Sequence, residues 1–234
     1  MKKAMIFSAF IVATLMVMGF SGNQPSNKET RNVKDFTRVA FGIPGDLYVN
    51  FGSDYKVILE GDKDILDNII TQVSGGKLVI KEDNWHIRMD KKVTIYITMP
   101  ALEGLSVSGS GKAVIKDAVK AKELDFSVSG SGKIYTADVT ADALDCSISG
   151  SGDIILQGSG AISDAEIGIS GSGNYTGESL KIGTADISIS GSGSCLCNVT
   201  GSLEAGISGS GNVTYIGNPK VDARVSGSGK VRSR

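Results

Sequence analysis

Short runs in which apolar and small polar residues alternate recur through the second half of the chain, at 105–108, 126–129, 146–149 and 187–190. Each run ends in the tetrapeptide Ser-Gly-Ser-Gly, which begins at positions 108, 129, 149, 170, 190, 208 and 226. Alternation places successive side chains on opposite faces of a strand. A repeat near twenty residues is typical of a solenoid, whose coils must stack to bury their apolar faces. The pattern predicts an all-β solenoid with glycine corners that adopt positive φ.

Alignment of the coils on the first Ser of each tetrapeptide separates inward columns from outward ones. The residues one, three and five positions earlier are apolar in most coils, as in Val128 and Leu124. Cys146 and Cys195 stand in such inward columns, and Cys197 lies two residues further along the same face. We interpret all three as buried thiols that pack as small apolar residues. A metal site would need a further ligand such as histidine, and the single His86 lies in another region.

The chain before the repeats divides into three parts. Residues 1–21 combine a charged start with an apolar run and predict a signal peptide, with a retained membrane anchor as the alternative. Residues 22–34 are polar and predict a flexible leader. Residues 35–234 form a single β-helix domain, in which 35–100 are irregular coils and 101–234 carry the tetrapeptides. Residues 64–70 have helical spacing and predict one short helix of two turns.

Charge and composition exclude several classes of partner and chemistry. The 234 residues include 24 basic and 25 acidic side chains, for a net charge of −1. This balance gives no indication of nucleic-acid binding. The tetrapeptide lacks the Gly-Lys-Ser/Thr of a phosphate loop and the nonapeptide period of calcium-binding β-rolls. We therefore predict no cofactor, no metal site and no catalytic residues, and no membrane span once the signal peptide is removed.

A column of carboxylates stands four residues before each tetrapeptide in six consecutive coils. Stacking would place these outward charges roughly 5 Å apart, where neighbours repel by roughly 1 kcal/mol in water. One interpretation is a surface that binds divalent cations or a basic partner. The other is a solvated stripe that keeps flat sheets from stacking on one another. This acidic column consists of Asp125, Asp145, Glu166, Asp186, Glu204 and Asp222.

Trp85 and His86 lie in a polar loop, residues 82–90, between two strands of the first half. An exposed Trp beside a His and an Arg is suited to stacking on a sugar or contacting a protein. The alternative is a side chain that folds over the end or edge of the solenoid. Together with the acidic column, these two residues are the candidate surface-binding residues.

The tetrapeptide array resembles a known bacterial family when it is read with the segments that precede it. Residues 36–49, Phe-Thr-Arg-Val-Ala-Phe-Gly-Ile-Pro-Gly-Asp-Leu-Tyr-Val, and the segments 66–70 and 76–80 carry the rest of the likeness. Together they resemble the head GIN domain of autotransporter adhesins, over nearly the whole chain from Phe36. The resemblance implies a right-handed parallel β-helix similar in shape to pectate lyases. It also implies a role in adhesion, with no known catalytic residues.

The combined expectation is an exported, non-enzymatic β-helical protein, acting as a cell-surface adhesin or an envelope binding protein. Its ligand would be a glycan or a protein, and its location the periplasm, the outer surface or the medium. Two alternatives stay open: a β-helical carbohydrate-active enzyme, as lyase or hydrolase, and a periplasmic accessory or sensor component. Whether the protein forms a homo-oligomer is also open.

Overall fold

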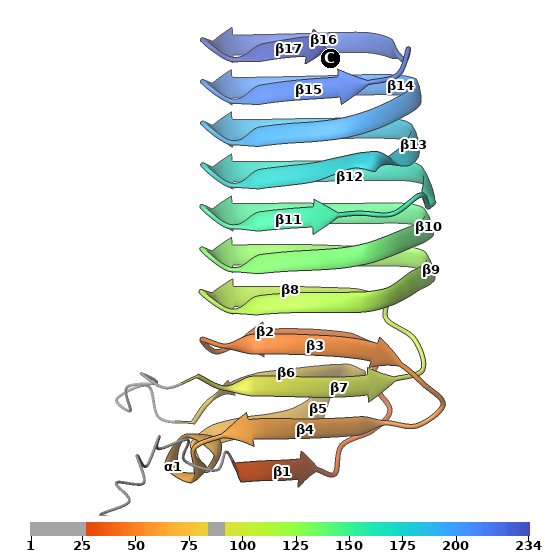
Figure 1. Ribbon diagram of the computed structural model, residues 1–234. Coiled ribbons are helices and arrows are strands. Elements are labelled where there is room, and N and C mark those ends of the chain that lie inside the picture. The colour runs from red at the N-terminus through yellow and green to blue at the C-terminus, as the bar shows by residue number, and fades with distance from the viewer. Residues whose placement is uncertain (1–26, 84–91) are drawn as a thin grey trace, which may run out of the picture.

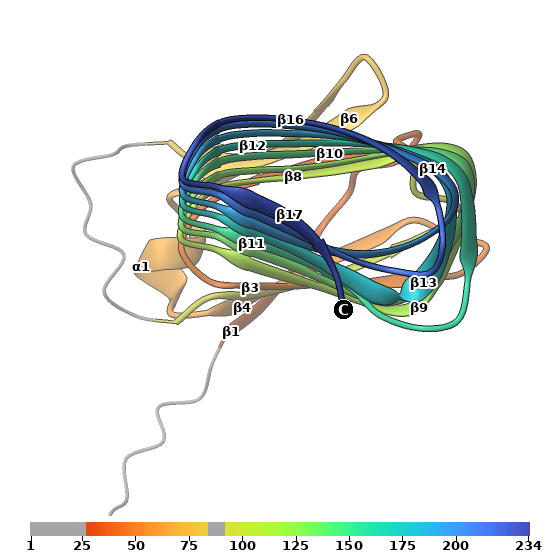
Figure 2. The same ribbon diagram turned by 90° about the horizontal axis from the view of Figure 1, so that it is seen from above.

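The chain folds into a solenoid whose coils stack along one axis, which confirms the predicted fold class (Figure 1). The computed structural model describes residues 27–83 and 92–234. Viewed along the axis, two walls of strands face each other across a single core (Figure 2). The first wall carries the runs that lead into the tetrapeptides, and the second wall carries the residues that follow them. The long strands bend from one wall to the other, so hydrogen bonds join the described strands into one continuous sheet.

Strands make up most of the described residues, and one short helix, α1 (Lys63–Leu66), accompanies them. The strands are β1 (Asn27–Arg31), β2 (Arg38–Gly42), β3 (Asp46–Phe51), β4 (Lys56–Gly61), β5 (Ile69–Ser74), β6 (Lys77–Glu82), β7 (Thr94–Met99), β8 (Gly104–Gly109), β9 (Lys112–Gly130), β10 (Lys133–Gly150), β11 (Asp153–Leu156), β12 (Ala161–Gly171), β13 (Asn174–Gly191), β14 (Ser194–Gly209), β15 (Asn212–Ile216), β16 (Lys220–Gly227) and β17 (Lys230–Ser233).

Inward side chains stack in columns through the tetrapeptide coils, because each of these coils pairs in parallel with the next. In the first wall, Val128, Ile148 and Ile169 stand in register on successive coils and are at most 2% exposed. Each such burial contributes about 1.5–3 kcal/mol relative to full exposure. Repetition of these columns builds one aliphatic core along the length of the solenoid.

The tetrapeptide corners need glycine for two separate reasons. Gly150 has a φ of 117°, a region that side chains rarely adopt. A Cβ added there would also lie 2.5 Å from the carbonyl oxygen of Gly130 in the preceding coil. The corners are joined to one another by hydrogen bonds, since the N–H of Ser151 donates to that same oxygen at 2.8 Å. The glycines therefore permit both the turn and the close stacking of one turn on the next.

The three cysteines are free and buried, as their inward positions predicted. Tyr175 stacks next to Cys195 in the same inward column of the second wall. Its ring fills the space left by Gly177, where an added Cβ would lie 2.6 Å from the phenol oxygen. Burial raises the pKa of Tyr175, Cys146 and Cys195 well above their usual values, so these groups stay neutral.

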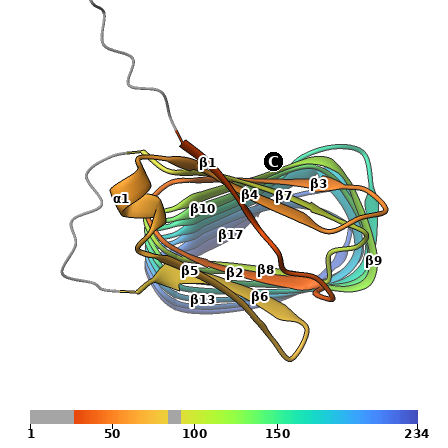
Figure 3. The same ribbon diagram turned by 90° about the horizontal axis from the view of Figure 1, so that it is seen from below.

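The first half of the chain forms coils that do not stack in chain order. Strand β2 lies between β6 and β8, and β3 lies between β7 and β9. Below them, β4 pairs antiparallel with β7, and β1 pairs antiparallel with β4. Seen from below, β1 and α1 lie at the N-terminal end of the solenoid (Figure 3).

The helix is shorter than the sequence predicted. It ends at Leu66, and Ile69 already begins β5, which forms an antiparallel hairpin with β6. The β-branched Ile69 and Ile70 favour a strand, and Gly75 and Gly76 supply the positive φ of a tight hairpin turn. Hairpin formation therefore prevails over the helical spacing of residues 64–70.

The structure also differs from the predicted leader at residues 22–34, because Asn27–Arg31 form β1. Lys28 Nζ lies 3.3 Å from Glu60 Oε2 on the paired strand β4. Arg31 Nη2 donates a hydrogen bond of 2.8 Å to the Leu66 carbonyl oxygen. These contacts attach β1 to the edge of the sheet, although the sequence of β1 has no alternation of apolar and polar residues. Over the described residues, no helix has the length and apolar character needed to cross a membrane.

Candidate ligand-binding surfaces

The six carboxylates of the acidic column lie in register on the outer face of the first wall, as predicted. Asp125 pairs with Asp145 on the next coil, and Asp145 pairs with Glu166. The column continues without a break to its last member on β16. Neighbouring coils lie about 4.8 Å apart, so the expected array of closely spaced like charges is present.

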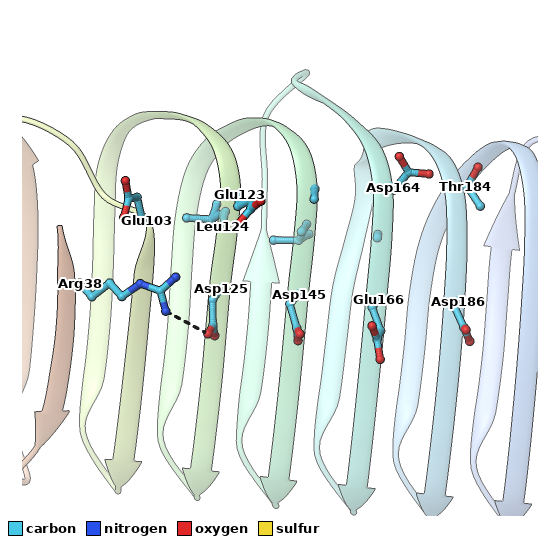
Figure 4. A pocket seen from close by; sticks show the side chains of 13 residues that line it. Arg38, Glu103, Glu123, Leu124, Asp125, Asp145, Asp164, Glu166, Thr184 and Asp186 are labelled. Atoms are coloured by element: carbon cyan, nitrogen blue, oxygen red, sulfur yellow. Dashed lines mark ion pairs between the residues drawn. The ribbon is translucent and has the colours of Figure 1, made fainter. Parts of the chain in front are cut away.

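Arg38 neutralises one end of the acidic column. Its side chain extends past Gly104, which has no side chain of its own, and its Nη1 lies 4.0 Å from Oδ2 of Asp125 (Figure 4). A groove of about 500 Å³ runs from this pair along the column. Glu103 and Glu123 add two more carboxylates beside it, so the groove has a strongly negative lining.

Arg224 neutralises the opposite end. Its Nη1 lies 3.6 Å from Oε1 of Glu204, and its Nη2 lies 3.3 Å from Oδ2 of Asp222. The three carboxylates in the middle of the column form no salt bridge within the described residues. The negative charge is therefore concentrated in the central coils.

The pKa of Asp145 is affected by this concentration of charge. Partial burial raises the pKa of its carboxyl group, and the neighbouring charges of Asp125 and Glu166 raise it further. In the part of the chain that the structure describes, no three His, Cys, Asp or Glu side chains converge to hold a metal ion. The groove thus offers a line of separate charges and no preformed coordination sphere.

Trp85 and His86, the other predicted surface-binding residues, lie outside the described residues. They stay a prediction.

A second surface, which the sequence analysis did not single out, lies on the outer face of the second wall. Here five apolar side chains follow one outward column, which we call the tyrosine strip. The register is continuous from β7 through β3, β9 and β10 to β11. The tyrosine strip consists of Tyr96, Tyr48, Val114, Tyr135 and Ile155.

The rings of Tyr48 and Tyr96 stack with their centroids 5.5 Å apart and their planes at 16°. Tyr96 is 37% exposed, which is unusual for a large apolar side chain in this chain. A hollow of about 360 Å³ opens over Val114 and beside Tyr135. The strip therefore presents one exposed ring, Tyr96, beside four half-buried apolar side chains, with a local depression at Val114.

Lys112 and Lys116 flank this hollow on either side of Val114. Lys112 Nζ lies 4.8 Å from the ring centroid of Tyr135, and Lys116 Nζ lies 5.3 Å from that of Tyr48. Such contacts contribute about 0.5–1 kcal/mol at exposed sites. Neither lysine forms a salt bridge within residues 27–83 and 92–234. Two cationic groups thus border an apolar depression.

The column beside the strip mixes charged and polar residues, and three consecutive members of it, Lys133, Asp153 and Asn174, contact one another. Lys133 forms a salt bridge with Asp153, and Asn174 Nδ2 donates to Asp153 Oδ1 at 2.9 Å. Partial burial opposes ionisation of Asp153, but the hydrogen bonds from Lys133 and Asn174 outweigh it and lower its pKa. The hydrogen bond that Lys133 donates to Asp153 also raises the pKa of Lys133.

Part of the tyrosine strip was within reach of the sequence. Val114, Tyr135 and Ile155 all stand three residues after the second Gly of a tetrapeptide. Tyr48 and Tyr96 could not be added, because no tetrapeptide aligns β3 and β7 with the later coils.

The fold and its outward columns define a β-solenoid repeat protein with extended side-chain surfaces. Residues 35–219 match a family described as "Putative auto-transporter adhesin, head GIN domain". The match covers most of the chain, which therefore belongs to this family and confirms the resemblance seen in the sequence. A search of curated proteins finds no match.

Solved structures with the same fold include proteins from Bacteroides and Parabacteroides species. A putative adhesin from Bacteroides fragilis is 25% identical with a TM-score of 0.83, and the alignment covers 90% of this chain and 98% of that one. A putative lipid binding protein from Parabacteroides distasonis is 23% identical with a TM-score of 0.74, covering 91% and 98%. A putative adhesin from Parabacteroides merdae is 21% identical with a TM-score of 0.70, covering 91% and 98%. The last two likenesses show the fold alone.

Proposed function

We propose that this protein is an exported, non-enzymatic adhesin or envelope binding protein that contacts its ligand through the outward columns of the solenoid. The observation that supports the proposal most is family membership over residues 35–219, together with a fold that presents regular side-chain columns on a continuous core. A stacked scaffold of this kind holds exposed side chains in fixed positions, which suits binding by a broad surface.

Two experiments test this proposal. Fractionation of the producing cell, with sequencing of the N-terminus of the exported chain, should find the protein in the envelope or medium and cleaved near Ser21. Beads coated with the purified protein should attach to cell surfaces, and soluble protein should compete with them. Cytoplasmic retention, or attachment no greater than that of albumin-coated beads, would contradict the proposal.

The enzymatic alternative has one observation in its favour. Retaining glycosidases use two carboxyl groups about 5–5.5 Å apart, one of them with a raised pKa. Asp145 has a raised pKa and stacks between Asp125 and Glu166 at about that coil spacing. However, an active site is one cluster, whereas these carboxylates continue along six coils.

Incubation with a panel of polysaccharides separates binding from catalysis. We expect no new reducing ends and no unsaturated products from any polymer. Turnover that disappears in an Asp145→Asn variant, while the fold is retained, would establish the enzyme instead.

A further inference from the structure

We propose that the outer face of the second wall binds an extended acidic glycan, anchored at the hollow over Val114 between Lys112 and Lys116. This inference rests on the proposed function as a binding protein and names the class of its ligand. It concerns a surface distinct from the acidic column, which lies on the opposite wall.

The anchor combines cationic groups with an apolar floor. Lys112, Val114 and Lys116 alternate along β9, so all three side chains point outward from one strand. Each lysine leans over a tyrosine ring of a neighbouring coil, and neither ammonium group has a carboxylate partner among the described residues. A ligand that brings an anionic group between the lysines would complete their interactions. Its apolar face would cover Val114 and the edge of Tyr135.

From the anchor towards the C-terminal coil, the outer face of the second wall continues as a long polar surface. A concave region of about 1160 Å³ extends over β11, β13, β14, β15 and β17. Amide and hydroxyl side chains line it, including Asn174, Thr176 and Asn212. The acidic side chains in its lining, Asp153 and Glu178, form salt bridges with Lys133 and Arg234. Such groups both donate and accept hydrogen bonds, as sugar hydroxyls do.

Cations also stand at the far end of this region. Lys112 and Lys230 occupy the same outward column, six coil spacings apart, which corresponds to about 29 Å. Arg232 lies beside Lys230 in the column of the tyrosine strip. A polymer with repeated negative charges can therefore contact positive groups at both ends of one continuous face.

The charge distribution directs a polyanion to this wall. The acidic column and its groove cover the first wall and repel a negatively charged chain. The second wall carries Lys112 and Lys116, which form no salt bridge in the part of the chain that the structure describes, and the cationic terminal coil.

A glycan fits this face better than a peptide does. Peptides that bind sheets usually add a strand to a free edge. Val114 and its neighbours already pair with β3 on one side and β10 on the other, so no backbone groups are free there. A glycan needs only the side chains, which is what the face offers.

An acyl chain fits less well, because lipid and other apolar ligands are held in pockets that bury most of their surface. The hollow over Val114 is open and is bordered by charged side chains. An acyl chain lying across it would stay largely in contact with water.

The test measures binding of the purified protein to polygalacturonate, a uronic-acid polymer, with uncharged dextran as the comparison. We expect binding to polygalacturonate that weakens as salt rises, and no binding to dextran. The double variant Lys112→Gln/Lys116→Gln should raise Kd about tenfold or more. The matched control Lys120→Gln/Lys122→Gln removes the same charge from exposed positions outside the hollow and should change Kd less than twofold.

A second variant, Tyr135→Leu, tests the ring without changing charge and should also weaken binding. Thermal melts of every variant establish that the fold is retained. Equal weakening by both lysine pairs would overturn the proposed anchor, because it would mean binding by net charge alone. No binding to polygalacturonate, or tighter binding to anionic phospholipid vesicles, would overturn the ligand class. Either result would leave the proposed function standing if coated beads still attach to cells.

Discussion

Asp145 and Asp153 lie eight residues apart on opposite walls of the solenoid, and their pKa values move in opposite directions. Partial burial opposes ionisation of both carboxyl groups. The difference arises from the residues stacked above and below. Asp145 lies between Asp125 and Glu166, whereas Asp153 lies between Lys133 and Asn174.

In a solenoid, the residue types that stack in one column determine whether electrostatic interactions along that column are repulsive or attractive. Every outward residue has its column neighbours about 4.8 Å away, so like residues add their repulsion and complementary residues add their attraction. The first wall repeats one type and accumulates negative charge. The second wall mixes types in the corresponding column, where Lys133 and Asp153 neutralise one another. A small change of sequence period or residue type therefore changes the electrostatics of a whole face.

The largest predicted effect comes from a substitution that disturbs the stacking of both walls. Gly150→Ala places a Cβ 2.5 Å from the Gly130 carbonyl oxygen and forces a side chain into positive φ. We expect the free energy of unfolding to fall by about 3 kcal/mol. For a domain of this size that corresponds to a melting temperature lower by about 6–12 °C, measurable by circular dichroism.

Gly168→Ala is the matched control. Gly168 lies on an outward position of β12, and an added Cβ there meets no atom within 4 Å. This variant should keep its stability or gain about 0.4–1 kcal/mol, because alanine restricts the unfolded chain. If both variants lose stability equally, the corner geometry is not the cause.

The second prediction exchanges each of the two aspartates for its neutral isostere. At pH 7 and low salt, Asp145→Asn should raise the free energy of unfolding by about 1 kcal/mol, because it removes repulsion from two neighbours. Asp153→Asn should lower it by about 1 kcal/mol, because it removes the carboxylate that Lys133 binds. Urea denaturation measures both. Changes of the same sign would disprove the contrast between the columns.

The stability differences of the two variants should depend on pH in opposite ways. Asp145 has a raised pKa, so the folded state binds its proton first, and stability rises as pH falls through that pKa. Asp153 has a lowered pKa, so its stabilising contribution is lost as pH falls through the folded value. Melting curves from pH 7 down to about 2 should show each Asn variant converging on the parent protein. A constant difference across that range would exclude titration of these groups as the cause.

The repeats made most of the solenoid predictable. The tetrapeptide spacing located the corners, and alignment on it placed Cys146 in the core and Asp145 in an outward column. These predictions succeeded because each coil repeats the same inward and outward alternation. Local pattern and tertiary position agree wherever one coil stacks on an equivalent coil.

The coils without tetrapeptides were less predictable, for identifiable reasons. The position of β2 and β3 between later strands depends on long-range pairing, which leaves no local signal. The end of α1 at Leu66 reflects competition with the β5–β6 hairpin. Strand β1 is held by contacts with β4 and Leu66, which are distant in the sequence. The segment has no apolar pattern of its own, so its polar sequence predicted a leader. The tyrosine strip combines residues from both halves, so the fold was needed to add Tyr48 and Tyr96 to the three residues that the tetrapeptides align.

The smallest predicted effect concerns cations at the acidic column. Because no described side chains converge on a metal position, calcium should act by screening and loose association. We expect calcium and magnesium at equal concentration to raise the melting temperature by the same small amount. Asp145→Asn should reduce that increase, because it removes charge from the centre of the column. Stabilisation by calcium that magnesium does not reproduce would mean that the carboxylates rearrange into a coordination site, since the two ions differ in the ligand number and geometry they require.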